Sequence, residues 1–212
     1  RMKGDIAITL KKIFMDNYKI YNKDFSIYEV SKRFHKTIRY GNCFFIREVP
    51  SVFGQRIKKN YLRCIERAEK QITIETPYFL PGHRIYKSLI NAVKRGVEVN
   101  VCIPQHSDVK VADVVRDAFL EQLYKHGVNI YLYPKGNLHS KLMLIDDNVF
   151  AIGSANMDNR SFRYMFEIAM LGSNPEIVKL IASHNLQTKQ MSLPFDETFY
   201  NSRTIAEKIL TF

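Results

Sequence analysis

The sequence has 212 residues, of which 46% are hydrophobic, and 32 Lys and Arg against 21 Asp and Glu give a formal net charge of +11. This length and apolar content predict one large α/β domain or a small pair of domains with a sizeable core. The charge indicates anionic partners, namely nucleic acid, phosphorylated substrates or a negatively charged membrane surface, and does not discriminate among them. The sequence contains no apolar run of the roughly 18 residues that a membrane span needs.

The predicted elements alternate between helices and strands along the chain. Helices are predicted over 2–21, 54–70, 85–95, 111–127 and 174–191 from the spacing of apolar residues and from terminal Gly and Pro residues. Strands are predicted over 43–50, 72–76, 97–104, 128–134, 139–146, 149–154 and 164–172. The segment 22–40 mixes basic and aromatic residues, as expected of a solvated surface segment or of a phosphate or lipid-headgroup contact.

This alternation predicts an α/β fold with a mostly parallel or mixed sheet that is flanked by helices on both faces. The continuous apolar run over 142–145 is typical of a strand that is covered on both sides. We expect an N-terminal arm over 1–41 and a domain over 42–212. Because the chain begins at Arg1 and ends in the unfinished pattern "AEKILTF", we expect a piece of a longer protein.

Three cysteines, Cys43, Cys64 and Cys102, are spaced widely along the chain. An odd number at such spacings predicts neither a disulfide framework nor a zinc site, and it is typical of a cytosolic protein. The Asp, Glu and His residues also show no metal-ligand spacing, so we predict no metal ion.

The stretch "LHSKLMLIDDNVFAIGSANMDNRSF" begins an apolar run with two polar residues, His139 and Lys141. In an extended chain these two side chains point to the same face. Ser154 and Asn156 repeat that spacing at the end of the next predicted strand. If the two strands are neighbours, the four polar groups meet at one end of the sheet, where α/β proteins tend to bind ligands.

Each of these residue types has a use in phosphoryl chemistry. An imidazole serves as a nucleophile or a proton donor near neutral pH, and an ammonium group stabilises phosphate oxygens in the transition state. Ser and Asn supply neutral donors to the same oxygens. Glu167, on the following predicted strand, is a candidate to orient and charge-balance the imidazole. For an isolated His-x-Lys pair, the simpler interpretation is a strand cap beside a solvated lysine.

The full spacing outweighs that simpler interpretation, because six positions with fixed gaps are specified. They read H-x-K-x4-D-x6-G-S-x-N and are occupied by His139, Lys141, Asp146, Gly153, Ser154 and Asn156. This pattern resembles the signature of the phospholipase D superfamily, and the downstream glutamate of that family matches Glu167. The segments "ITIETPYFLPG" and "GSANMDNRSFRYMFE" resemble the second half of bacterial cardiolipin synthases. Arg1 then lies just past a first motif that this chain lacks.

The resemblance implies a phospholipase D-like fold and a mechanism without metal or cofactor. Two motifs face each other, one histidine forms a phosphohistidine, and the other protonates the departing alcohol. For a cardiolipin synthase, donor and acceptor are both phosphatidylglycerol. In related enzymes the first-half histidine is usually the nucleophile, which favours the acid–base role for His139 but leaves both roles open. The resemblance counts Asp146 among the catalytic residues, in a structural, hydrogen-bonding role.

Four further residues are candidate substrate contacts. Tyr78 and Phe79 follow a predicted strand and line a lipid entrance, or else form a packed turn beneath the sheet. Asp108 shapes the mouth of a pocket or only starts the next helix. Arg160 contacts a headgroup or belongs to a turn.

Alternatives to the cardiolipin synthase are a phospholipase D that transfers the intermediate to water, a metal-independent homodimeric nuclease, and a non-catalytic domain that binds lipid or nucleic acid. The complete signature argues against the last of these. The expected partners are anionic phospholipid at a membrane surface and either a second lobe of the same protein or a second copy of the chain, with nucleic acid less favoured. The resemblance implies a location on the cytoplasmic side of the bacterial inner membrane, peripheral or anchored through other parts of the protein.

Overall fold

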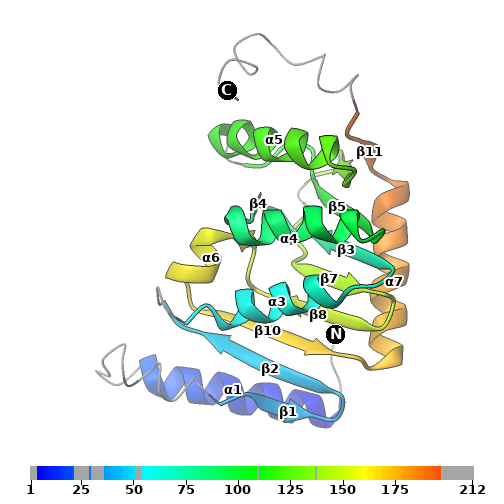
Figure 1. Cartoon of the computed structure of the whole chain (residues 1–212). Helices are drawn as coiled ribbons and strands as arrows, with labels where there is room; N and C mark the ends of the chain where they lie inside the picture. The colour runs from blue at the N-terminus through cyan, green and yellow to red at the C-terminus, as the bar shows by residue number, and fades with distance from the viewer. Residues whose placement is uncertain are drawn as a thin grey trace.

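A computed structural model describes residues 4–21, 29, 36–50, 54–108, 110–136 and 138–196. Its helices are α1 (Asp5–Tyr21), α3 (Arg56–Arg67), α4 (Gly82–Lys94), α5 (Lys110–Lys125), α6 (Asn159–Tyr164) and α7 (Pro175–Gln190) (Figure 1). The longer strands are β2 (Cys43–Glu48), β3 (Gln71–Glu75), β5 (Glu98–Pro104), β6 (Asn129–Tyr133), β7 (Leu142–Ile145), β8 (Val149–Gly153) and β10 (Glu167–Gly172). The short strands are β1 (Ile38–Tyr40), β4 (Phe79–Leu80), β9 (Met157–Asp158) and β11 (Leu193–Pro194).

Nine strands form one sheet in the order β1-β2-β10-β8-β7-β3-β5-β6-β11, and β4 pairs with β9 separately. The helices α4 and α5 connect β3 to β5 and β5 to β6, and these strand pairs are parallel because a crossover helix returns the chain to the same edge. A tight turn joins β7 to β8, so this pair is antiparallel, and β8 is also antiparallel to β10. The sheet is therefore mixed, as predicted.

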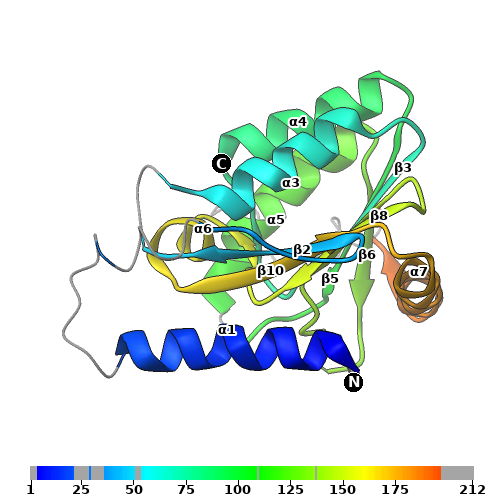
Figure 2. The same cartoon turned by 90° about the horizontal axis from the view of Figure 1, so that it is seen from below.

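Helices cover both faces of the sheet (Figure 2). On one face, α3 and α4 contribute Ile57 and Leu89 to a cluster that includes Met143 and Ile145 of β7. On the other face, α1 and α7 pack on a second cluster, which contains the alternate residues of β7, Leu142 and Leu144. Because alternate side chains of one strand enter different clusters, the whole apolar run of β7 is buried. The prediction of a sheet with helices on both faces is confirmed.

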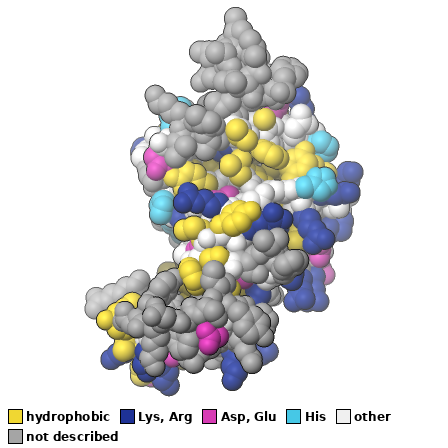
Figure 3. All heavy atoms as spheres, turned by 90° about the vertical axis from the view of Figure 1, so that its left-hand side faces the viewer, with side chains coloured by type: hydrophobic (Ala, Val, Ile, Leu, Met, Phe, Trp, Pro, Cys, Tyr) yellow, Lys and Arg dark blue, Asp and Glu magenta, His cyan; other side chains and the backbone are white. Residues whose placement is uncertain are grey.

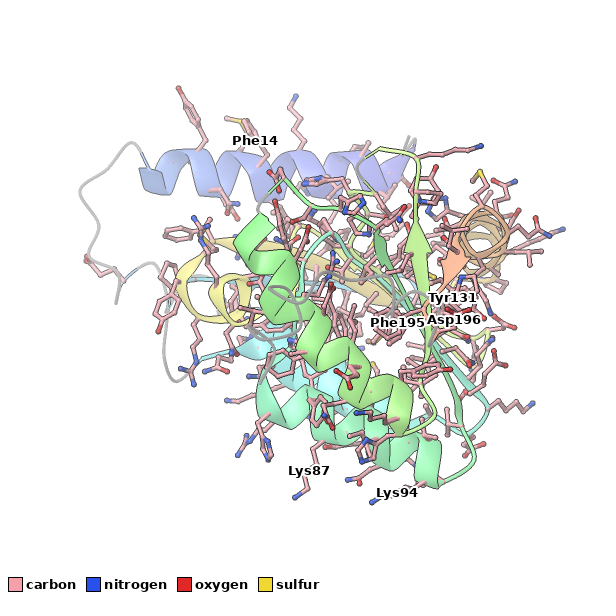
Figure 4. All side chains as sticks on the ribbon, turned by 90° about the horizontal axis from the view of Figure 1, so that it is seen from above. Phe14, Lys87, Lys94, Tyr131, Phe195 and Asp196 are labelled. Atoms are coloured by element: carbon pink, nitrogen blue, oxygen red, sulfur yellow. The ribbon has the colours of Figure 1, made fainter. Side chains whose placement is uncertain are left out.

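Helix α1 buries Ile6 and Ile13, as its apolar spacing predicts. The apolar spacing of this segment, which consists of Ile6, Leu10, Ile13 and Phe14, also predicts Phe14 on the buried face, but its side chain is 63% exposed. Figure 4 shows Phe14 on the side of α1 that faces away from the sheet, because its position is rotated by about 80° from that of Ile6 at ~100° per residue. The division into an arm over 1–41 and a domain over 42–212 stays a prediction, and most of the ambiguous segment 22–40 lies outside the described residues.

The strand that was predicted from residue 164 starts three residues later, at Glu167. The Asp158 side chain accepts a hydrogen bond from the Ser161 N–H at 2.6 Å and thereby caps α6, which extends to Tyr164. Four short strands and α6 were not predicted, because strands of two or three residues and a helix of six residues show too little periodicity. Within the described residues, no helix has the length and apolar character of a membrane span.

The turn between β7 and β8 is joined to α3 and β3 by one carboxylate. Asp146 has a φ of 53° and accepts the backbone N–H groups of Glu69, Lys70 and Gln71 at 3.0, 2.8 and 2.9 Å. Burial works against the charged form, but the three N–H donors outweigh it and lower the pKa of Asp146. This side chain therefore fixes one end of β7.

We predict that Asp146→Asn lowers the free energy of unfolding by about 1–3 kcal/mol, because an amide leaves part of this donor set unmatched. Asn tolerates a positive φ, so the substitution adds little backbone strain. Since the folded-state pKa of Asp146 is lowered, its contribution is complete above about pH 4 and is lost as the pH falls through the folded-state value. Urea titrations at neutral and acidic pH measure this difference, with Asp147→Asn as the control.

We predict that Gly153→Ala destabilises the protein by about 1–3 kcal/mol through overpacking. A Cβ atom at Gly153 would collide with the Ile168 carbonyl oxygen and would lie 2.8 Å from the Cα of Ala169. Urea unfolding checks this expectation against Leu180→Ala, a control at a side chain that is 70% exposed. Wild-type stability of Gly153→Ala would contradict the close approach of β8 and β10.

Candidate active site

The pairing of β7 with β8 brings the predicted polar groups to one end of the sheet. The Gly153 N–H donates to the Lys141 carbonyl at 3.1 Å, and the Ser154 N–H donates to the Ile168 carbonyl at 2.9 Å. In an antiparallel pair, the start of the first strand lies beside the end of the second. Lys141, Ser154 and Glu167, the first residue of β10, therefore lie at one end of these strands, as the sequence predicted for Lys141 and Ser154.

His139 and Lys141 lie immediately before β7 and not within it, yet their side chains are together. The Lys141 Nζ lies 3.2 Å from His139 Nδ1 and 2.9 Å from the His139 carbonyl oxygen. His139 is exposed and Lys141 is half-buried. Burial lowers the pKa of Lys141, although the carboxylates of Glu167 and Asp158 act in the opposite direction. The ammonium group is thus partly desolvated beside an accessible imidazole.

Ser140, which lies between His139 and Lys141 in the sequence, is hydrogen-bonded to a residue of the core. Its Oγ donates a hydrogen bond to the carboxylate of Glu75, which is fully buried. The same carboxylate oxygen lies 2.9 Å from the Nε2 of His184. His184 shows no partner pattern in the sequence, because its partner is 109 residues away. Glu75 therefore holds the backbone that carries His139 and Lys141.

Ser154 and Glu167 form a second pair at the same edge. The Ser154 Oγ donates to the Glu167 carboxylate and accepts the Ile168 N–H at 3.0 Å. Burial raises the pKa of Glu167, while hydrogen bonds from Ser154 and Ser161 act in the opposite direction. The Oδ1 atom of Asn156 is buried and has no hydrogen-bond partner. Together, a lysine, an imidazole and neutral hydrogen-bond donors can bind a phosphoryl group and stabilise the charge on its oxygens.

A cleft of about 530 Å³ opens beside these residues. Its walls include Asn156, Asp158, Glu167 and two of the predicted substrate contacts, Tyr78 and Arg160. This volume is typical of a site for a small molecule or a lipid headgroup.

The other two predicted substrate contacts do not line the cleft. Asp108 accepts a hydrogen bond from the Tyr78 hydroxyl, and this bond is the main cause of a raised pKa of Tyr78. Phe79 is fully buried in β4, in agreement with the packed alternative that its sequence context left open.

Asp146 is not brought to the cleft. It follows β7, whereas Lys141 precedes it, and five residues at ~3.3 Å each separate the two Cα atoms by about 16 Å. A larger groove of about 630 Å³ lies at the Asp146 end of β7. Of the six motif positions, Asn156 lines the 530 Å³ cleft, Lys141, Gly153 and Ser154 meet at the same end of the strands, and Asp146 fixes the opposite end of β7.

Asp158 was missed by the sequence analysis. It is 8% exposed, caps α6, lines the cleft and interacts electrostatically with Lys141 and Glu167. The signal for it is the sequence Asp158-Asn-Arg-Ser161, in which an aspartate three residues before a serine is typical of a helix N-terminus.

Comparisons with known proteins match these features. Residues 61–188 match the family model described as "Cardiolipin synthase, PLD-like domain". The chain is 28% identical to the probable cardiolipin synthase YwiE of Bacillus subtilis over 208 residues, which cover 98% of this chain and 42% of that protein. It is 42% identical to cardiolipin synthase A of Pseudomonas putida over 111 residues, 52% of this chain and 23% of that protein. The chain thus spans less than half the length of these relatives.

The fold is similar to those of solved structures of low sequence identity. Nuc of Salmonella typhimurium, a phospholipase D family member, matches with a TM-score of 0.58 at 19% identity over 72% of this chain and 99% of that one. The phosphatidylserine synthase of Haemophilus influenzae matches with a TM-score of 0.61 at 15% identity over 79% of this chain and 44% of that one. With more than half of its residues matched by the family model, the chain belongs to the phospholipase D-like family of cardiolipin synthases.

Proposed function

We propose that this chain is the C-terminal catalytic lobe of a phosphatidyltransferase of the cardiolipin synthase type that acts on phosphatidylglycerol. The observation that carries the proposal is the His139–Lys141 pair, anchored through Ser140 to Glu75, at the edge that also presents Ser154 and Glu167. The cleft beside this edge and the membership in the cardiolipin synthase family support the same function.

In the proposed reaction, an imidazole nitrogen forms a bond to phosphorus while the bond from phosphorus to the glycerol oxygen breaks. The departing oxygen takes a proton from a second imidazole. The hydroxyl oxygen of another phosphatidylglycerol then attacks phosphorus, the phosphorus–nitrogen bond breaks, and the hydroxyl proton returns to the second imidazole. His139 supplies one of the two imidazoles.

In this scheme Lys141 and the amide group of Asn156 hold the non-bridging phosphate oxygens, and Ser154 joins them when its hydroxyl proton turns from Glu167 to the phosphate. The partial burial of Lys141 supports the assignment, because a charge interacts more strongly with an oxyanion when less water screens it. Glu167 balances the charge of the imidazole and of Lys141, and Asp146 acts only on the fold.

The second imidazole comes from a preceding lobe of the same protein or from a second copy of this chain. The match to 42% and 23% of the length of the cardiolipin synthase relatives supports the first arrangement. The substrate and the net charge of +11 both favour a negatively charged membrane surface as the place of reaction, on the cytoplasmic side of a bacterial membrane.

We predict that the full-length protein that contains this chain forms cardiolipin and glycerol when it is incubated with phosphatidylglycerol vesicles. Mass spectrometry of the lipid products measures this outcome. Phosphatidic acid without cardiolipin would instead indicate a hydrolase. Cleavage of single-stranded DNA in the absence of lipid turnover would replace the proposal with a nuclease.

We predict that His139→Ala abolishes product formation and that Lys141→Ala lowers kcat by about two orders of magnitude, because removing an oxyanion donor costs ~3 kcal/mol. The control is His126→Ala, which changes an exposed histidine in the turn after α5 and leaves the rate unchanged. Steady-state rates with phosphatidylglycerol measure all three variants. Wild-type turnover by either His139→Ala or Lys141→Ala would remove that residue from the chemistry.

A further inference from the structure

A lysine that the proposed chemistry does not use is buried next to the cleft. Lys58, on α3, is only 7% exposed. Its Nζ donates a long hydrogen bond of 3.4 Å to the Oδ1 of Asn159 and lies 5.9 Å from the centre of the Phe162 ring. Asn159 lines the cleft. A buried ammonium group normally pairs with a carboxylate, so a lysine with an amide as its hydrogen-bond partner is unusual.

Two arginines interact electrostatically with this lysine. After burial, which is the largest cause, the positive charges of Arg163 and Arg84 also lower the pKa of Lys58. The Nε atom of Arg163 is itself buried without a hydrogen-bond partner. The nearby Glu48 does not neutralise the group, since its carboxylate accepts the Ile57 N–H at 3.0 Å and its electrostatic partner is Arg56. Among the residues that the structure describes, no carboxylate forms an ion pair with Lys58, Arg84 or Arg163.

We refer to Lys58, Arg84, Arg163 and Asn159 together as the cationic corner. The N-terminus of α4 adds backbone N–H donors to this corner. Helix α4 has no side-chain cap and no acidic residue in its first turn, so its first N–H groups are positive and unpaired by side chains. The Asn159 side chain covers this terminus, because a Cβ atom at Gly82 would lie only 2.8 Å from its Oδ1. Figure 1 shows the first turn of α4 beside α6, and Figure 3 shows Lys and Arg side chains around an apolar patch on this end of the molecule.

We infer that the cationic corner binds the phosphodiester group of the acceptor lipid, the phosphate that does not react. This inference rests on the proposed function, in which two phosphatidylglycerol molecules bring two negative charges to one cleft. The acceptor hydroxyl oxygen forms the new bond to phosphorus as the phosphorus–nitrogen bond breaks, and the acceptor's own phosphate stays intact. That second anion needs a cation of its own, because it would otherwise repel the reacting phosphate.

The reacting phosphate is bound by a different cation, Lys141. Lys141 interacts with Glu167 and Asp158, whereas Lys58 interacts with Arg163 and Arg84. The two sets share no member. Each lysine lies behind the cleft wall and interacts with one of two consecutive wall residues, Lys141 with Asp158 and Lys58 with Asn159. In the inferred arrangement, the two lipid phosphates are held by separate cations at neighbouring parts of this wall.

The test compares an anionic acceptor with a neutral one. The full-length protein is incubated with phosphatidylglycerol vesicles in the presence of ethanol, and mass spectrometry gives the ratio of cardiolipin to phosphatidylethanol. We expect Lys58→Met to lower this ratio by roughly tenfold or more, because a hydrogen bond between charged groups is lost only with the anionic acceptor. Arg84→Gln, at an exposed position, should shift the ratio in the same direction even if Lys58→Met does not fold.

The matched control is Lys87→Met, which removes the same charge from α4 at an exposed side chain that points away from the protein (Figure 4). It should keep the wild-type ratio. An unchanged ratio in the folded variants Lys58→Met and Arg84→Gln would overturn the inference while the proposed function stands. A wild-type protein that forms neither product would instead reject the proposed function.

A binding measurement distinguishes a lipid headgroup from free phosphate. Calorimetric titration with glycerophosphoglycerol should show binding to the wild-type protein that is weakened about tenfold or more in Lys58→Met. Binding of inorganic phosphate that depends on Lys58, without binding of glycerophosphoglycerol, would assign the corner to free phosphate and overturn the acceptor assignment.

Discussion

The arrangement of the cleft depends on the close approach of β8 to its two neighbouring strands at Gly153. On one side the Gly153 N–H bonds to the Lys141 carbonyl, and on the other the absence of a side chain admits the backbone of Ile168. Because these contacts use backbone atoms only, the side chains of Lys141, Ser154 and Glu167 are free of them, and Ser154 and Glu167 bond to each other at the side of the cleft. A polar site is thereby built on the stiffest part of the fold, between strands whose apolar side chains are buried on both faces.

The carboxylates that position the strands and turns around the site accept hydrogen bonds from neutral donors instead of pairing with Lys or Arg. Asp146 accepts three backbone N–H groups, Asp158 accepts the Ser161 N–H, and Glu75 accepts the Ser140 hydroxyl. Such bonds satisfy a desolvated charge and fix turns and helix ends without neutralising the basic residues. The positive charge of the site is therefore largely preserved for an anionic ligand, which agrees with the net charge of +11.

The sequence predicted the features that depend on local spacing. The alternation of strands and helices, and the convergence of Lys141, Ser154 and Glu167, follow from backbone periodicity and from one tight turn. The structural, hydrogen-bonding role of Asp146 was expected from the family resemblance, but its three partners were not visible in the sequence, because they are 75 to 77 residues away. Lys58 was missed for the same reason, since it meets Asn159 across 101 residues and nothing in its local sequence separates it from the other basic residues of α3. Phe14 was misplaced because four apolar positions cover more of a helix than the sheet contacts.

The half-buried Lys141 and the buried Lys58 differ in a way that matches the two phosphates of the proposed reaction. Lys141 lies among carboxylates, so an approaching phosphate gains little from overall attraction and depends on hydrogen bonds that strengthen as the reaction proceeds. Lys58 lies among cations, so the corner around it attracts an anion in its ground state. Weak ground-state binding suits the phosphate that must react and leave. Firm binding suits the acceptor phosphate, which only positions the acceptor hydroxyl. This division of charge between Lys141 and Lys58 is therefore the one that the proposed transfer between two anionic lipids requires.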